Sequence, residues 1–326
     1  MISRGMPITV GLLLMVTVTA MWGVSFLTPV VLSGYTPIDI TIGRYVFYGV
    51  VSVAFWLWRY RAQKVRGEMW TMAVVYAVTG NLGFSVLVSY GIQTAGPIVS
   101  IPIIGMLPLI VAIFGNASLS ELPWVRLWVP LAVIAAGLFV VLGTESGLFS
   151  AHAVETSWSG VGAIVLTILM WTWFAISNAR FLRGNKDIDG GAWSCLVGMA
   201  TLLISLLWEA ASAMLEPGST LTAKLAVRDD YLAFVGLTSF LGIGASWAAG
   251  WLFNKASINL PMNLVGQLIV LETVFGIFYV YLYERHLPPP IELAGMCGIL
   301  AGITLSIRTI KKRELEEAQI APAATS

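Results

Sequence analysis

Charge is what this chain of 326 residues most lacks, because Asp, Glu, Lys and Arg together make up only 11% of it, against roughly 25% in an average soluble domain. So few charged groups cannot cover a water-facing surface, so lipid must be the solvent over most of the chain. The formal net charge of +1 also gives no electrostatic reason to expect a nucleic-acid partner. Composition therefore indicates a membrane protein that binds no nucleic acid.

Residues that commonly carry catalysis or bind metals are also scarce. His152 and His286 both fall in loops between apolar runs, so no histidine dyad or metal site within the membrane can be drawn. Cys195 and Cys297 lie in apolar stretches, which favours packing over a disulfide or a metal site. The chain has no glycine-rich phosphate loop ending in Lys-Ser or Lys-Thr, which excludes a nucleotide-driven pump for this chain alone. We therefore expect no catalytic residues, no cofactor and no metal.

Long apolar runs are what the chain has in abundance: 58% of its residues are hydrophobic and the mean hydropathy is +0.85. A helix needs about 20 apolar residues to cross the hydrocarbon of a bilayer. The runs that qualify are Pro7–Val31, Pro37–Trp58, Trp70–Ile92, Pro97–Gly115, Leu122–Leu142, Trp158–Ser177, Gly191–Met214, Tyr231–Phe253, Leu260–Leu282 and Pro290–Ile307. The first is too long for the apolar part of a cleavable signal peptide, so we interpret it as the first span. The sequence predicts an all-α polytopic membrane protein with ten transmembrane helices.

The basic residues orient these spans. If the N-terminus is cytoplasmic, fourteen of the 18 Lys and Arg residues fall on the cytoplasmic side, three fall outside and Arg44 lies within a span. Lys and Arg accumulate in cytoplasmic loops of membrane proteins. We therefore expect both termini in the cytoplasm of a bacterial cell, with the chain in its inner membrane.

The two halves of the chain repeat one another. Met21-Trp22-Gly23 in the first span and Met170-Trp171-Thr172 in the sixth stand 149 residues apart, and the same offset sets Arg44 opposite Trp193. Each unit has five spans, an odd number, so the second copy must enter the membrane from the other side. We expect two inverted five-helix repeats, residues 1–145 and 156–310, followed by a cytoplasmic tail at 311–326. In transporters, such symmetry places the binding site near the midplane between the halves.

Several short motifs then resemble one known family. Trp22-Gly23-Val24-Ser25-Phe26 is similar to its W-G-x-x-F, Arg44 to the Arg-Phe of its second span with Tyr45 in place of Phe, and Leu271-Glu272-Thr273-Val274-Phe275 to its L-E-P-V-F. Glu284 with Gly295 and Ala301-Gly302 resembles its closing G-E…G…A-G-V. In their order along ten spans these motifs resemble the EamA family of the drug/metabolite transporter superfamily. The resemblance implies a transporter of small solutes, since members of the family export amino acids or other metabolites and some take metabolites up.

Two ionisable residues within spans are candidates for the site. Glu272 lies near the middle of the ninth span, where an ionisable group costs on the order of 3 kcal/mol unless it faces a cavity or a partner. It either exchanges protons or binds a substrate amine, or it is a structural carboxylate. Arg44 either holds a substrate carboxylate through its planar fork, reaches the headgroups, or pairs with Glu272.

Aromatic and polar residues extend the candidate site. Trp22 and Trp171 are equivalent in the repeat and are expected to meet near the centre, as walls for an apolar or cationic group or as packing. Polar residues recur on the third, eighth and ninth spans, with Asn81 opposite Ser246 at an offset of 165. Such stripes bind substrate or join helices, and we favour a shared cavity. The polar and aromatic candidates on these spans are Tyr76, Asn81, Ser85, Ser246, Trp247, Asn263 and Gln267.

The hypothesis that combines these features is a transporter that exports small metabolites, most readily aromatic or apolar amino acids, by alternating access through a central cavity. Its partners would be a small-molecule substrate, the bilayer and, as a candidate coupling ion, the proton. Uptake or efflux of a drug, sugar or nucleotide-type metabolite is the alternative within transport, and a membrane enzyme or a lipid-handling protein is the alternative outside it. A channel is disfavoured, since no ring of charges or repeated carbonyl filter is legible. The fifth and tenth spans are expected to lie outside the cavity and support it. Gly298 and Gly302 of the tenth span, at G-x-x-x-G spacing, are expected to pack either the two halves or two protomers together.

Overall fold

The computed structural model describes residues 7–32, 34–95, 100, 103–119, 123–145, 157–285 and 287–320. In this part of the chain all regular structure is helical and no β-strand occurs. Pro102, Glu121, His152 and His286 lie outside the described residues. Helices are the expected outcome in lipid, because an α-helix satisfies its backbone hydrogen bonds within one segment.

The first half contains α1 (Ile8–Val31), α2 (Pro37–Phe55), α3 (Gly67–Tyr76), α4 (Gly83–Ala95), α6 (Leu107–Leu119) and α7 (Trp128–Glu145). The second half contains α8 (Trp158–Gly184), α9 (Gly190–Leu215), α10 (Leu221–Leu225), α11 (Tyr231–Ser239), α12 (Ala249–Asn259), α13 (Met262–Ile269), α14 (Leu271–Glu284) and α15 (Pro290–Ile320). Three π-helical segments extend or join these: η1 (Trp56–Tyr60) after α2, η2 (Ala77–Leu82) between α3 and α4, and η5 (Phe240–Ala248) between α11 and α12. The 3₁₀ turns η3 (Trp124–Arg126) and η4 (Pro217–Ser219) precede α7 and α10.

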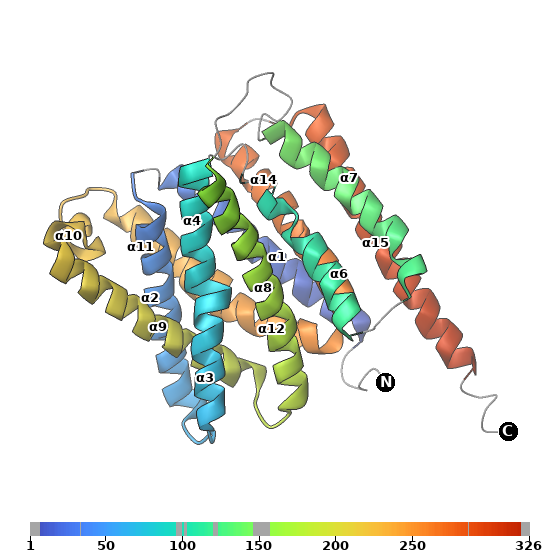
Figure 1. Ribbon diagram of the computed structural model, residues 1–326, viewed down its shortest axis with the longest axis horizontal. Coiled ribbons are helices and arrows are strands. Elements are labelled where there is room, and N and C mark those ends of the chain that lie inside the picture. Colours follow the sequence, from blue (N-terminus) through green and yellow to red (C-terminus); the bar gives the residue numbers. More distant parts are fainter. Residues whose placement is uncertain are drawn as a thin grey trace.

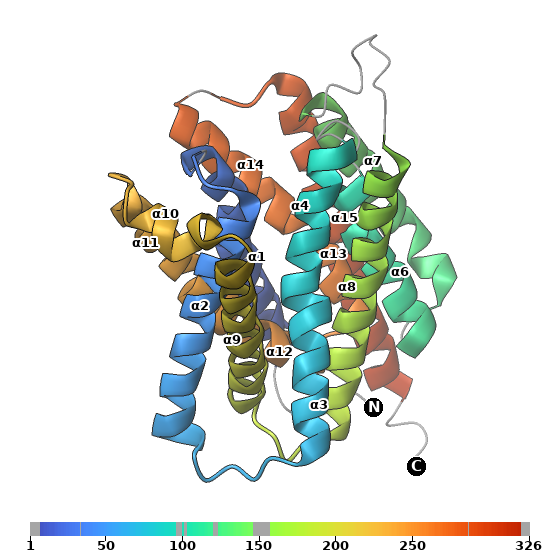
Figure 2. The same ribbon diagram turned by 60° about the vertical axis from the view of Figure 1, so that its left-hand side comes forward.

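The prediction of ten spans is confirmed. Eight helical stretches are long and apolar enough to cross a membrane, and the shorter apolar stretches Ile103–Ser118 and Trp128–Val141 occupy the places of the predicted fourth and fifth spans. α1 begins and α15 ends at the same end of the bundle (Figure 2), as an even number of spans requires. We call this the terminal end of the bundle. α15 continues to Ile320, so the predicted tail begins as an extension of the last helix.

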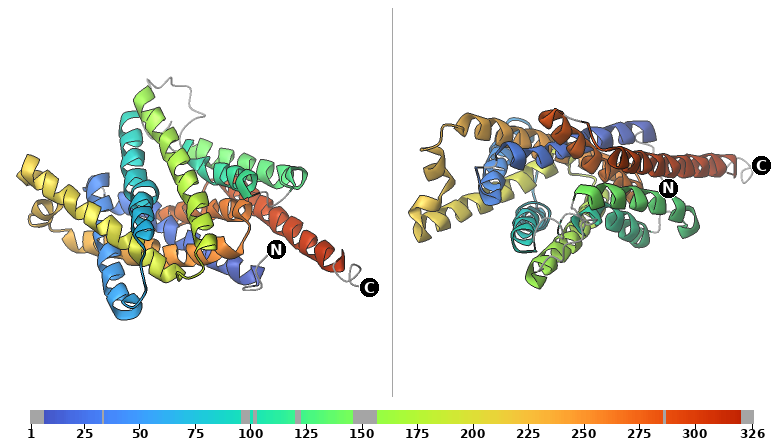
Figure 3. Two further views of the ribbon diagram at one scale, coloured as in Figure 1. Left: turned by 60° about the horizontal axis from the view of Figure 1, so that its bottom comes forward. Right: turned by 90° about the horizontal axis from the view of Figure 1, so that it is seen from above.

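Helix packing follows the repeat. Three spans pack against their own counterparts, as α2 on α9, α6 on α13 and α7 on α15. Other large contacts form matched pairs. The contact of α4 with α8 joins the third and sixth spans, and its counterpart, α1 with α12, joins the eighth and first. The contact of α6 with α8 joins the fourth and sixth spans, and its counterpart, α1 with α14, joins the ninth and first. Figure 3 shows cyan α4 beside yellow-green α8 on one side of the molecule. This pattern is the one expected from two five-helix units related by a two-fold axis.

Small residues allow the closest helix contacts. α7 and α15 lie together along one edge of the molecule (Figure 1). A Cβ on Gly137 of α7 would lie 2.6 Å from the Gly295 carbonyl oxygen and 2.7 Å from the Ile299 nitrogen of α15. Gly23, beside Trp22 in α1, likewise has no room for a Cβ, which would lie 2.9 Å from the Gly276 nitrogen of α14. The backbones therefore touch in both places, and at α7 and α15 this contact joins the two halves, one of the two alternatives expected for the tenth span.

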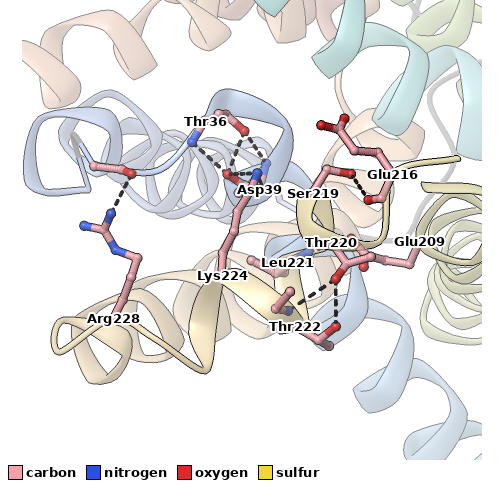
Figure 4. Close-up of polar contacts among 12 residues, drawn as sticks. Thr36, Asp39, Glu209, Glu216, Ser219, Thr220, Leu221, Thr222, Lys224 and Arg228 are labelled. Atoms are coloured by element: carbon pink, nitrogen blue, oxygen red, sulfur yellow. Dashed lines mark hydrogen bonds and ion pairs between the residues drawn. The ribbon is translucent and has the colours of Figure 1, made fainter. Parts of the chain in front are cut away.

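A polar clamp joins the halves at the end of the bundle opposite the termini (Figure 4). The Lys224 Nζ of α10 lies 2.7 Å and 2.9 Å from the two carboxylate oxygens of Asp39, which is 3% exposed. Asp39 also accepts from the backbone N–H and hydroxyl of Thr36, whose side chain in turn caps the Asp39 N–H at the start of α2. This reciprocal capping fixes the start of α2, and the ion pair ties it to the second half.

Candidate functional site: a central cavity between the repeats

A cavity of about 200 Å³ lies in the middle of the bundle. Its lining comes from α1, α2, α4, α6, α8, α9, α12, α13 and α14 and from the π-helical segments η2 and η5. Its lining residues include Trp22, Ser25, Arg44, Tyr45, Tyr48, Asn81, Phe84, Ser85, Trp171, Phe174, Asn178, Trp193, Ser194, Ser246, Phe253, Asn254 and Glu272. Among the described residues, none in α7 or α15 lines it. This confirms the expectation that the fifth and tenth spans lie outside the cavity.

Irregular backbone borders this cavity in both halves at related positions. The π-helical segments η2 and η5 occupy matching parts of the third and eighth spans, and they carry Asn81 and Ser246 into the lining. The fourth and ninth spans are interrupted at Met106 and Val270, just before the lining residues Leu107 and Glu272. π-Helical turns are frequent at functional sites, and broken helices are common around transporter binding sites. The repeat symmetry thus extends to the local backbone around the cavity.

Aromatic rings form one wall. Trp22 and Trp171 meet edge to face with ring centroids 6.3 Å apart, and Phe253 lies 5.5 Å from Trp22 and 6.4 Å from Trp171. The indole N–H of Trp22 donates to the Ala245 carbonyl oxygen of η5 at 2.8 Å. Phe84 and Phe174 complete the wall against Trp171, at 6.4 Å and 5.8 Å. The predicted meeting of Trp22 and Trp171 at the centre is what the structure shows.

Polar groups form the facing wall. The Arg44 Nε donates to the Ser246 hydroxyl at 2.8 Å, and Nη1 lies 3.5 Å from the Ser25 hydroxyl. Ser85 shares a 3.1 Å hydrogen bond with the Tyr45 hydroxyl, and the Asn81 amide donates to Thr201 at 3.3 Å. Arg44 is therefore held by hydroxyl groups from two spans, and its guanidinium is available to an anionic group in the cavity.

Glu272 supplies the opposite charge. Its carboxylate lies in the first turn of α14 and lines the cavity. Among the described residues, it accepts no hydrogen bond and forms no ion pair, although the Arg44 charge acts on it electrostatically. The two groups therefore do not form the fixed pair considered from the sequence. Partial positive charge at the start of α14 favours a carboxylate at this place.

A buried hydrogen-bond chain borders the cavity toward the terminal end. The Trp193 indole N–H donates to the Asn178 oxygen at 2.7 Å, and the Asn178 amide donates to the Asn254 oxygen at 2.8 Å. These residues join α8, α9 and α12, and the sequence interpretation did not select them as site residues. The sequence signal that could have indicated Trp193 as a site residue is the repeat offset of 149, which sets it opposite Arg44.

Four predicted site residues lie elsewhere. Tyr76 is fully buried against Trp193 and Phe174 and shares a 2.7 Å hydrogen bond with Ser177. Trp247 points its indole N–H to the Cys195 sulfur at 3.3 Å and borders a second pocket. Asn263 and Gln267 are buried where α13 packs on α6, and the Asn263 amide donates to Asn116 at 3.4 Å. The polar face of α13 that carries Asn263 and Gln267 therefore packs against α6 and does not line the cavity.

The chemistry of the cavity follows from these groups. A guanidinium, a carboxylate and an aromatic wall that line one cavity complement a small molecule that carries a negative group, a positive group and an apolar or aromatic body. Among the described residues, no group of three or more His, Cys, Asp and Glu side chains could hold a metal ion.

Comparisons with known proteins agree with this architecture. The model of the EamA-like transporter family matches residues 9–143. Inner membrane protein YtfF of Escherichia coli is 29% identical over 307 residues, which cover 91% of this chain and 94% of that protein. An uncharacterized transporter of Haemophilus influenzae is 45% identical over 40 residues, which cover 12% of this chain and 24% of that protein. A crystal structure at 17% identity superimposes with a TM-score of 0.72 over 94% of this chain and 99% of that chain, which shows a shared fold.

Proposed function

We propose that this chain, whose residues 9–143 match the EamA-like transporter family, exports amino acids, with aromatic or apolar side chains preferred, by alternating access through the central cavity. Its similarity to these transporters supports a multi-pass inner-membrane protein that transports small solutes.

One observation carries the proposal: Arg44, Glu272 and the Trp22–Trp171 pair line the same cavity. In an amino acid, the α-carboxylate would bind the Arg44 fork, the α-ammonium would bind Glu272, and the side chain would lie against the indoles. Cation–π attraction from Trp22 and Trp171 adds to the ammonium binding. A purely cationic drug would leave Arg44 unpaired beside it, which disfavours that alternative.

Glu272 is also the group that we propose couples transport to protons. Because Glu272 lines the cavity, a site that opens alternately to the two sides would expose its carboxyl group to each compartment in turn. Export would then deliver one proton inward for each substrate that leaves.

The test is flux in proteoliposomes that contain the purified protein, with L-tryptophan, L-phenylalanine and L-leucine screened with and without a proton gradient. We expect the gradient to accelerate flux of at least one of these, and Glu272→Gln to remove that acceleration while the protein stays folded. The matched control is Glu216→Gln, in an exposed residue outside the cavity, which should behave as wild type. A Glu272→Gln protein with the wild-type rate at every pH would show that Glu272 is structural.

A second measurement addresses the substrate class. Arg44→Gln keeps a hydrogen-bonding side chain but removes the charge, so we expect at least a roughly tenfold higher KM for an amino acid. Amines that lack a carboxylate should lose nothing by the same change. If wild-type liposomes carry amines or sugars and no amino acid, the proposed substrate class is wrong.

A further inference from the structure

A second pocket, of about 300 Å³, lies at the terminal end of the bundle, where α2 and η1 meet the start of α9 and the segment from η5 to α12. Its lining residues are Phe55, Trp58, Arg59, Tyr60, Asp189, Gly191, Trp247 and Trp251. It is separate from the central cavity, and none of the described residues lines both.

Aromatic side chains make most of its wall. Phe55 lies 4.6 Å from Trp247 and 5.1 Å from Trp58, and Trp247 lies 6.3 Å from Trp251 at an angle of 33°. The Trp251 indole nitrogen is buried with no acceptor among the described residues. A buried donor without an acceptor is costly, and the rings of this wall present flat apolar surfaces.

The same pocket carries both signs of charge. Asp189 accepts from the Tyr60 hydroxyl at 2.7 Å and from the Gly191 N–H at 2.8 Å, while it caps α9. Burial is the largest influence on the pKa of Asp189 and opposes ionisation, yet the hydrogen bonds from Tyr60 and the α9 backbone and the nearby Lys255 charge together hold that pKa below its usual value. Arg59 is exposed and has no carboxylate within ion-pair distance among the described residues. The pocket thus presents an ionised carboxylate and an unpaired guanidinium.

The second pocket and the central cavity are back to back. Consecutive residues of η5 divide between them, with Ser246 in the cavity and Trp247 in the second pocket. α9 contributes Ser194 to the cavity and Gly191 to the second pocket, and α2 contributes Tyr48 to the cavity and Phe55 to the second pocket. Ser194 and Trp247 touch within this partition, where the Ser194 hydroxyl donates to the Trp247 carbonyl oxygen at 3.4 Å. A solute in the second pocket would be separated from the cavity by little more than one layer of side chains.

From this combination we propose that the second pocket is a loading site for the same class of solute, a small aromatic zwitterion, on its way to the central cavity. The inference rests on the proposed function for its substrate class. Asp189 receives the ammonium group, Arg59 receives the carboxylate, and the ring of the solute lies among Phe55, Trp247 and Trp251. The chemistry repeats that of the central cavity with different residues.

The test is equilibrium binding of radiolabelled L-tryptophan to the purified full-length protein in detergent. We expect two molecules per chain in the wild type, and one in Glu272→Gln, which disables the central site. Adding Arg59→Gln to that variant should weaken the remaining site about tenfold or more, since a charge-assisted hydrogen bond is lost. Arg59 is exposed, so its replacement should leave the fold intact. Trp58 is also exposed and lines the same pocket, so Trp58→Ala should weaken L-tryptophan binding at this site too. Arg61→Gln, in an exposed arginine that does not line the pocket, is the matched control and should bind as its parent does.

The outcomes separate this inference from the proposed function. One L-tryptophan per chain, lost in Glu272→Gln and unaffected by Arg59→Gln, overturns the loading site and leaves the proposed function standing. Two per chain without any flux in liposomes overturns the proposed function and leaves the second site. If Arg59→Gln instead removes a co-purifying phospholipid seen by mass spectrometry, with L-tryptophan binding unchanged, the pocket holds a lipid headgroup and the inference is wrong. Absence of L-tryptophan binding in the wild type overturns both.

Discussion

At the scale of single residues, charge is placed in two ways in this protein. Arg44 and Glu272 face a cavity, where each keeps capacity for a ligand. Arg228 and Asp230 instead satisfy each other at the end of the bundle opposite the termini, where the guanidinium donates to both carboxylate oxygens at 2.8 Å and to the Gly34 carbonyl oxygen at 3.0 Å. The guanidinium also lies 4.3 Å from the centre of the Tyr35 ring. The first arrangement suits binding and the second suits holding a turn in place.

The Arg228–Asp230 pair predicts a pH dependence of stability. The hydrogen bonds from Arg228 hold the pKa of Asp230 at about 2, below the roughly 3.9 of an unperturbed Asp. Because the folded-state pKa is depressed, the stabilisation is fully present above about pH 4 and is lost as the pH falls toward about 2. We expect Arg228→Gln to lower the melting temperature by a constant amount between about pH 5 and about pH 8, and by less as the pH falls below about 4. Scanning fluorimetry of both proteins measures this, and a difference that grows in acid would contradict it.

At the scale of elements, the closest contacts come from residues without side chains. α7 and α15 approach until Gly137 meets the backbone of α15, and Gly302 meets the backbone of α7. Ala301, beside Gly302, is exposed at the surface of the bundle. Because Ala301 is exposed, a bulky side chain there has no physical reason to lower the folded yield. Only one face of α15 is close to its partner, and Ala301 is not on it.

This contrast gives a matched pair of variants. A Cβ on Gly302 would lie 2.5 Å from the Ile134 side chain and 2.9 Å from the Ile134 nitrogen, so Gly302→Leu must push the two helices apart. Overpacking of this kind costs typically about 1–3 kcal/mol, and we expect a lower folded yield and melting temperature. Ala301→Leu changes the neighbouring residue, faces outward, and should leave both unchanged. Equal effects in the two variants, measured by size-exclusion profile and thermal melting in detergent, would refute this packing.

At the scale of the whole molecule, the two-fold relation decides where the cavity lies. Spans pack on their own counterparts in three places, and the first and sixth spans bring Trp22 and Trp171 together at the centre. A site between inverted halves can be presented to either side of the membrane by similar movements of the two halves. The orientation in the membrane is the remaining global property, and the basic residues predict it.

We expect both termini to be cytoplasmic. Thirteen of the fourteen basic residues assigned to that side lie within the described residues, between spans at the terminal end or in α15, so reversal would place them outside, against the usual distribution. Green fluorescent protein fused after Ser326 should fluoresce, and alkaline phosphatase fused there should be inactive. The same reporters inserted at Gly218, in the turn at the opposite end, should give the reverse pattern. Alkaline phosphatase that is active only when fused to the C-terminus would invert the topology.

The sequence by itself determined the ten spans, the repeat and the central meeting of Trp22 and Trp171. These depend on the total length of apolar runs and on residue order, which do not change with the way helices rotate against each other. Seven of the eleven selected site residues line the cavity, Arg44, Asn81, Ser246 and Glu272 among them.

Only the tertiary structure decided which polar face turns inward. Asn263 and Gln267 lie one turn apart, as do Asn81 and Ser85, yet the first pair is buried between helices and the second lines the cavity. In a bilayer both kinds of contact require polar residues at helical spacing, so the pattern is the same for a binding surface and for a helix–helix joint. The π-helical segments η2 and η5 also change the direction in which the residues after them point. A regular helical period of about 3.6 residues does not predict this change. The position of Trp247 behind Ser246, in a different pocket, depends on that local geometry and on the packing of α2 and α9 around it.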